Sequence, residues 1–164
     1  MTRVSFPSLL QRLLLSTLFL FGINSTAQAG DMAKMLIEVP SPLGFEETLE
    51  KLEANAKGLG WKVPKKWKVD FQRNLKHVTK VDIGKNRVLK MCEPQAAAEL
   101  LVKDQYKMLT AMMPCTIAVY EKSDGKTWVS MMNLKLMGEM YGGDVAQMAS
   151  ELAPQMEQML KLAD

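Results

Sequence analysis

Two cysteines, Cys92 and Cys115, are the side chains of this 164-residue chain best suited to chemistry, and 22 residues lie between them. Cys92 ends a predicted strand over residues 87–92, and Cys115 begins another over residues 115–121. If these strands are antiparallel neighbours, the two sulfurs lie at the same end of the sheet, whereas parallel strands would place them at opposite ends. The pair therefore predicts a structural disulfide, two buried unpaired thiols or part of a ligand site.

Methionines are concentrated around both cysteines. Of the 14 Met in the chain, five lie beside the cysteine-bearing strand ends or on a predicted hairpin: Met91, Met112, Met113, Met131 and Met132. Two thiolates with one or two thioethers form a soft ligand set that selects Cu(I) over harder ions. The candidate Cu(I) ligands are Cys92, Cys115, Met91 and Met113. Packing in the core is the alternative role of the methionines.

Other chemical signals have simpler structural explanations. The single histidine, His77, has no Cys-x-x-Cys-His motif beside it and is expected in an exposed loop. Four lysines and two tryptophans lie within residues 61–68, and strand alternation would point the tryptophans inward and most of the lysines toward water, which favours a solvated face over a nucleic-acid or lipid patch. The chain has no phosphate loop, dinucleotide fingerprint or Gly-x-Ser-x-Gly motif. The sequence therefore indicates no catalytic residue.

The first 29 residues have the layout of a secretory signal peptide. Arg3 and Arg12 are not accompanied by any acid, residues 13–23 are almost purely apolar, and an Ala-Gln-Ala sequence ends at Ala29. The apolar run is roughly half of the ~20 residues that span a bilayer. We therefore expect cleavage near Ala29, a periplasmic or secreted protein, and no membrane span afterwards.

Removal of this segment changes the charge of the protein. Residues 30–164 keep 19 basic and 18 acidic side chains, a formal charge of +1. This near-neutral balance removes the main support for nucleic-acid binding. The length suits a single domain over residues 30–164, and two Cys with one His cannot complete a closed zinc site of the Cys/His kind.

Hydrophobic periodicity predicts alternating strands and helices in the first half of this domain. A short apolar strand is expected over residues 35–39, and a helix runs from Phe45 to a stop near Gly58. Apolar and polar residues alternate over residues 61–71, which predicts the clearest strand of the chain. A further extended segment is expected over residues 78–83.

The second half is more regular. After the strand over residues 87–92, Pro94 sits in the first turn of a helix that continues to about Val102. An Asp-Gly turn joins two predicted arms of a hairpin, residues 115–121 and 127–132.

A last helix is expected to begin near Asp144. Asp144 and Gln147 resemble a capping box, in which side chains bond the first backbone N–H groups of a helix. Pro154 should kink or divide this helix because proline removes one backbone hydrogen bond.

Four segments carry a resemblance to a known family, namely residues 45–49, 60–63, 88–94 and above all 113–121. Over residues 35–160 the chain resembles the domain-of-unknown-function 302 (DUF302) family. The most specific part is a strand-Cys-x-Pro-helix segment followed about twenty residues later by a Pro-Cys pair that opens a strand. The resemblance implies an α+β fold like that of the TATA-box-binding protein, with a curved antiparallel sheet packed against helices and often a homodimer. It implies no activity.

These observations favour binding over catalysis. The first expectation is an exported, non-enzymatic binding module that holds a soft metal ion or a small apolar ligand near Cys92 and Cys115. One alternative is a thiol redox protein, although the cysteines lack the close Cys-x-x-Cys spacing that lowers a thiol pKa. The other is a disulfide-stabilised scaffold for an exported partner protein.

Overall fold

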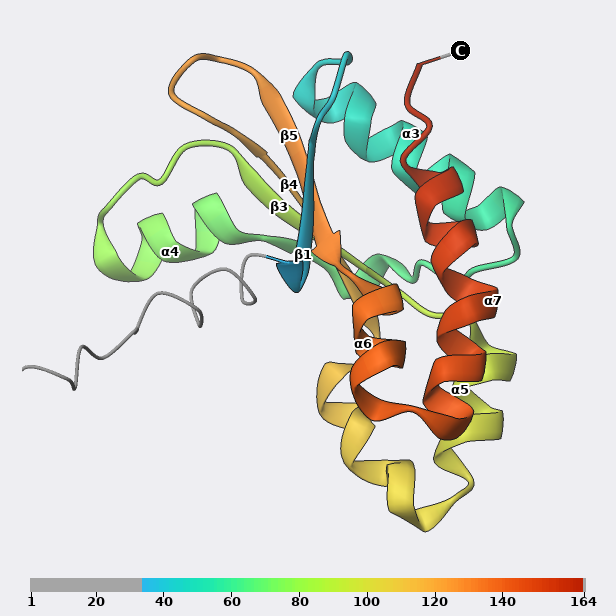
Figure 1. Cartoon of the computed structure of the whole chain (residues 1–164). Helices are drawn as coiled ribbons and strands as arrows, with labels where there is room; N and C mark the ends of the chain where they lie inside the picture. The colour runs from blue at the N-terminus through green and yellow to red at the C-terminus, as the bar shows by residue number, and fades with distance from the viewer. Residues whose placement is uncertain (1–33, 164) are drawn as a thin grey trace, which may run out of the picture. The chain divides into compact units, whose positions relative to one another are not determined.

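A computed structural model gives the fold of residues 34–163 (Figure 1). The strands are β1 (Leu36–Pro40), β2 (Lys68–Asp70), β3 (Asn86–Met91), β4 (Cys115–Glu121) and β5 (Thr127–Met132). The helices are α3 (Phe45–Gly58), α4 (Phe71–Thr79), α5 (Pro94–Leu101), α6 (Leu134–Tyr141) and α7 (Gly143–Met159), with 3-10 turns η1 (Lys65–Trp67) and η2 (Asp104–Met112). The predicted signal peptide and its cleavage near Ala29 lie outside the described residues.

These five strands form an antiparallel sheet in the order β1-β5-β4-β3-β2. The predicted hairpin is confirmed residue for residue as β4 and β5, and its turn places Gly125 at a φ of 77°, which glycine adopts without steric cost. The prediction of an α+β fold with an antiparallel sheet packed against helices is confirmed.

The main core lies between one face of the sheet and the helices α3 and α7. Alternate residues of the central strands point into it, and Ile117, Val119 and Val129 are at most 1% exposed. The helices supply Leu52 and Met156, which are equally buried. This packing fixes the helices over the sheet and explains why α3 was predictable from its apolar periodicity.

A second group of helices packs beyond one end of the sheet. In Figure 1, α5, η2 and α6 lie below the strands, and α7 runs from this group up beside α3. The helices α6 and α7 approach closely at Gly138, where an added Cβ would lie 2.7 Å from Ala149 Cβ. None of the helices in residues 34–163 is long and apolar enough to cross a membrane.

The predicted strand over residues 61–71 is mostly wrong. Lys62 forms an isolated bridge with Cys92, and the regular strand β2 covers only Lys68–Asp70. The chain then becomes the helix α4 because the Asp70 side chain accepts a hydrogen bond from Arg73 N at 2.9 Å and caps it. The extended segment expected over residues 78–83 is also wrong, since α4 continues to Thr79.

The C-terminal helix forms without the predicted capping box. The helix α7 begins at Gly143 with no side-chain cap, and Asp144 instead accepts a hydrogen bond from Lys103 Nζ at 2.6 Å. Pro154 lies inside α7 and does not divide it. Its exposed position lets water hydrogen-bond the carbonyl that loses its N–H partner.

Candidate functional site

A pocket of about 270 Å³ lies where β4 begins and β5 ends, between the sheet and the second group of helices. Strands β4 and β5 form one side, and residues of α5, η2, α6 and α7 form the others. Its volume is close to the lower end of the ~300–1,000 Å³ range of small-molecule pockets. The pocket is therefore a candidate site for a small ligand.

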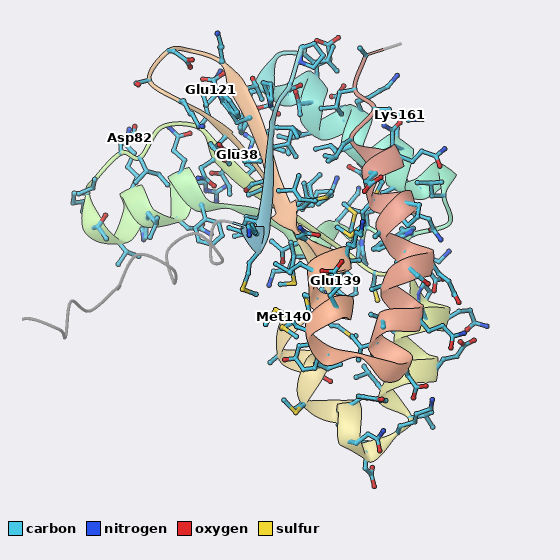
Figure 2. The ribbon with its side chains drawn as sticks, in the orientation of Figure 1. Glu38, Asp82, Glu121, Glu139, Met140 and Lys161 are labelled. Atoms are coloured by element: carbon cyan, nitrogen blue, oxygen red, sulfur yellow. The ribbon has the colours of Figure 1, made fainter. Side chains whose placement is uncertain are left out.

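Sulfur-containing side chains form much of the lining. They make up eight of the 19 lining residues: Cys92, Cys115, Met112, Met113, Met131, Met132, Met137 and Met148. In Figure 2 the yellow sulfur atoms gather between the end of the sheet and the helices α6 and α7. Most other lining residues are aliphatic or aromatic, including Leu134, Leu152 and Trp61. The pocket is thus apolar, soft and polarisable.

The two cysteines lie at the same end of the sheet. Strands β3 and β4 are antiparallel neighbours, and Met91 is directly opposite Cys115 in their register. Cys92 follows Met91 and lines the pocket together with Cys115. Both cysteines are free thiols in the structure, so the disulfide between them stays a prediction.

Burial keeps both thiols protonated. Loss of hydration raises the pKa of Cys92, and the negative charge of Glu93 raises it further. The same loss of hydration, with a contribution from Cys92, raises the pKa of Cys115 to about 11. Because the thiolate is the reactive form, both cysteines are weak nucleophiles at neutral pH. They contribute to the pocket mainly as small apolar groups.

One ionisable carboxylate, Glu93, lines the pocket, and it already has partners. Its oxygens accept hydrogen bonds from Ala96 N at 2.6 Å and Gln95 N at 3.3 Å, so it caps α5. Among the described lining residues there is no Lys, Arg or His. Thr116 and Ser130 supply the other polar side chains. The lining therefore has no basic group to pair with an acidic ligand.

The structure brings together most of the predicted metal ligands. Cys92, Cys115 and Met113 line the pocket, whereas Met91 is fully buried in the main core beside it. Within residues 34–163, no three Cys, His, Asp or Glu side chains converge on a metal position. A soft metal here would therefore depend on the methionines as ligands.

Two pocket methionines were not among those that the sequence placed near the cysteines. Met137 lies on α6, a helix that hydrophobic periodicity did not reveal, and Met148 lies on α7. The available signal for α6 was Asn133, whose side chain accepts a hydrogen bond from Leu136 N and caps the helix.

The remaining sequence candidates lie outside the pocket. His77 is exposed, as expected, although it lies on α4 rather than in a loop. The lysines at positions 62, 65, 66 and 68 are exposed, while Trp61 is 2% exposed and points into the core.

Comparisons with known proteins agree with the family resemblance. The family described as "Domain of unknown function DUF302" matches residues 37–163. A similar solved structure is the crystal structure of an uncharacterized conserved DUF302 protein from Bacillus stearothermophilus, with a TM-score of 0.68 and 23% sequence identity. The match covers 79% of this chain and 98% of that chain. None of the curated proteins matches this chain. At this identity the structural likeness establishes the fold alone.

Proposed function

Because the chain belongs to the DUF302 family, whose name assigns no activity, we propose its function from the pocket: a non-enzymatic module that binds a small, uncharged, apolar molecule. The observation that carries this proposal is the nearly complete apolar and sulfur lining of the 270 Å³ pocket. Each Å² of apolar ligand surface removed from water contributes roughly 25 cal/mol.

The charge of the lining restricts the ligand class. A buried carboxylate without a partner costs several kcal/mol, and the described lining has no cation to offset that cost. Glu93 would also repel an anion at close range. The ligand is therefore an uncharged molecule, and a hydroxyl or carbonyl on it could hydrogen-bond Thr116 or Ser130.

A titration with the fluorescent apolar probe phenylnaphthylamine tests this proposal. Ala97 on α5 lines the pocket, so Ala97→Phe should fill part of it and weaken probe binding by about tenfold or more. Ala98 is the next residue and is exposed, so Ala98→Phe is the matched control and should bind the probe like the unmodified protein. Equal binding by both variants, or no binding by the unmodified protein, would contradict the proposal.

Cu(I) is the second candidate ligand because eight sulfur-containing side chains converge on the pocket. Binding would release protons from Cys92 and Cys115, since a coordinated thiol is deprotonated. A competition titration with Cu(I) should show a large loss of affinity in the Cys92→Ser, Cys115→Ser double variant. A Met108→Leu, Met140→Leu variant changes two exposed methionines outside the pocket and is the control. Unchanged affinity in the serine variant would exclude this site.

A thiol redox function has weaker support. The raised pKa values of Cys92 and Cys115 oppose the thiolate that disulfide exchange requires. If the two thiols do pair, a reduction potential below about −300 mV would indicate a structural disulfide, as the scaffold alternative requires. A higher potential would favour redox cycling.

Export and self-association complete the proposal. Residues 1–29 act as a signal peptide, and the domain over residues 30–164 functions in the periplasm or outside the cell; mass spectrometry of the N-terminus tests this. A homodimer would cover the apolar side chain of Leu36 on the edge strand β1, which is 59% exposed. Sedimentation equilibrium tests the dimer, and a monomer at all concentrations would exclude it.

A further inference from the structure

One surface of the described chain combines exposed apolar and basic side chains. It comprises α4 and the segment after it, residues 71–85, and is named the α4 surface. No residue of α4 is buried. The large apolar side chains of this surface are 37–77% exposed: Phe71, Leu75, Val78, Val81 and Ile83. They are half of the ten large apolar side chains that are exposed in residues 34–163, so a structural role in the core does not explain them.

The α4 helix is amphipathic, and its apolar side is only partly covered by the rest of the described chain. Phe71, Leu75 and Val78 recur at helical spacing and share one side of the helix. Arg73 and Lys76 lie between them in sequence and are exposed. Figure 1 shows α4 standing apart from α5, α6 and α7, and its principal contact is with β3.

Positive charge is concentrated on the same surface. Residues 71–85 contain four Lys or Arg and one acid, Asp82, a net charge of +3. The rest of residues 30–164 carries a net charge of −2, because the total is +1. Asp82 already binds Lys76 Nζ at 2.7 Å, which lowers the pKa of Asp82 to about 2. Lys85 Nζ pairs with Glu121 Oε1 at 2.9 Å, and Lys80 Nζ donates a hydrogen bond to the His77 carbonyl at 2.9 Å, so Arg73 and Lys80 are the cations of this surface that do not pair with a carboxylate in the structure.

We propose that the α4 surface binds peripherally to bilayers that contain anionic phospholipids. A short amphipathic helix with basic residues on its polar side can lie in the membrane interface, with its apolar side about 5–10 Å into the headgroup region. The exposed Val78 and Val81 would enter the interface and the neighbouring Lys80 would contact phosphate groups, while Arg73, on the opposite side of α4, would act through its charge over a longer distance.

Charge favours a bilayer over a second copy of the chain at this surface. A two-fold contact of the α4 surface with itself would bring two segments of net positive charge together, and like charges across an interface oppose association. An anionic lipid surface has the complementary sign and attracts each basic side chain within a Debye length.

Co-sedimentation of the protein with vesicles tests the proposal. Binding is expected to phosphatidylglycerol vesicles, weaker binding to pure phosphatidylcholine vesicles, and loss of binding at high salt. Each basic side chain near an anionic surface strengthens binding about fivefold, so Arg73→Gln with Lys80→Gln should weaken it about five- to 25-fold, with Lys80 contributing the larger part. The control Lys65→Gln with Lys66→Gln removes the same charge from another exposed site and should have little effect.

A second pair of variants tests the apolar component. Val78→Asp should abolish vesicle binding. The control is Val102→Asp, which should not; Val102 follows the last residue of α5 and is 75% exposed. The proposal is overturned if the protein does not bind phosphatidylglycerol vesicles, or if the Lys65/Lys66 control loses as much affinity. It is also overturned if Val78→Asp abolishes self-association of a protein that binds no vesicles, since the surface is then an interface between copies.

Discussion

The pocket and the α4 surface use similar apolar side chains in opposite settings. The pocket is concave, its lining has no cation among the described residues, and sulfur atoms gather in it. The α4 surface is exposed, carries a net charge of +3 and has no buried residue within α4. The first setting suits a small uncharged molecule, because it removes water from most of the ligand. The second setting suits contact with a broad surface of opposite charge, such as an anionic bilayer.

Substitutions in the two regions should also differ in their effect on the stability of the protein. The pocket walls belong to the two packed helix groups and the sheet, so a change there affects folding and binding together. The helix α4 contributes no residue to either core cluster. Substitutions on α4 should therefore affect interactions without unfolding the protein.

The largest expected effect compares two aromatic residues. Trp61 is 2% exposed, lines the pocket and donates a hydrogen bond from Nε1 to Gln155 Oε1 at 2.8 Å. Trp61→Ala should lower the free energy of unfolding by about 3–5 kcal/mol. Phe71→Ala, at a residue that is 41% exposed on α4, should lower it by less than about 1 kcal/mol. Urea denaturation measures both, and equal losses would show that α4 is part of the stability core.

The next effect concerns the close approach of α6 and α7. A Cβ at Gly138 would lie 2.7 Å from Ala149 Cβ and 3.2 Å from Ala146 Cα. Gly138→Ala should therefore separate the helices, cost about 1–3 kcal/mol and weaken probe binding, because Met137 on α6 lines the pocket.

The control is Gly58→Ala at the end of α3, where an added Cβ meets nothing within 4 Å. It should be neutral or stabilise the protein by about 0.4–1 kcal/mol, because alanine restricts the unfolded chain more than glycine does. A loss of stability in Gly58→Ala as large as in Gly138→Ala would contradict a specific steric effect at the α6–α7 contact.

Sequence periodicity predicted the elements whose pattern is set by burial. In β4 and β5 every second residue faces the core, and in α3 the apolar residues recur at helical spacing on the side that faces the core. This spacing was sufficient to predict all three elements. The prediction of a strand over residues 61–71 was wrong although Trp61 and Val63 are buried as the pattern required. The segment that carries them is followed by the 3-10 turn η1, and the Asp70 cap then starts the helix α4. Alternation of apolar and polar residues does not distinguish a regular strand from a short extended segment that ends in a turn.

The pocket was only partly predictable for a related reason. Cys92, Cys115 and the nearby methionines were identified because they stand at predicted strand ends. Met137 and Met148 reach the same space through helix packing, which depends on the fit between Gly138 and α7 rather than on local pattern. The sequence could thus indicate sulfur chemistry at the sheet end but not an enclosed pocket.

The buried thiol of Cys115 should make stability and thiol reactivity depend on pH. Since the pKa of Cys115 is raised from 9.0 to about 11, its contribution to stability is complete below pH 9 and is lost as the pH rises through 11. At pH 8, its alkylation by iodoacetamide in a Cys92→Ser variant should be at least about tenfold slower than in the unfolded chain, because loss of hydration still raises the pKa of Cys115 although the contribution of Cys92 is gone. Equal alkylation rates would show that Cys115 is not buried in solution.

The smallest expected effect lies on the outer surface of α3. Glu53 binds Lys57 Nζ at 2.7 Å and also contacts Lys68; the Lys57 and then the Lys68 hydrogen bonds lower the pKa of Glu53 from 4.5. Glu53→Gln should cost less than about 1 kcal/mol above pH 4.5, and less as the pH falls through the lowered pKa. Glu50→Gln on the same helix is the control. A loss above about 2 kcal/mol would show that this exposed cluster matters as much as the core.

Competition between decanol and decanoate for the phenylnaphthylamine site tests the central claim most directly, because the two ligands share a chain and differ in charge. The pocket lining predicts that decanol displaces the probe at a concentration at least about tenfold lower than decanoate at neutral pH, and that Ala97→Phe weakens both. Tighter binding of decanoate, or displacement unaffected by Ala97→Phe, would contradict an uncharged apolar ligand in this pocket.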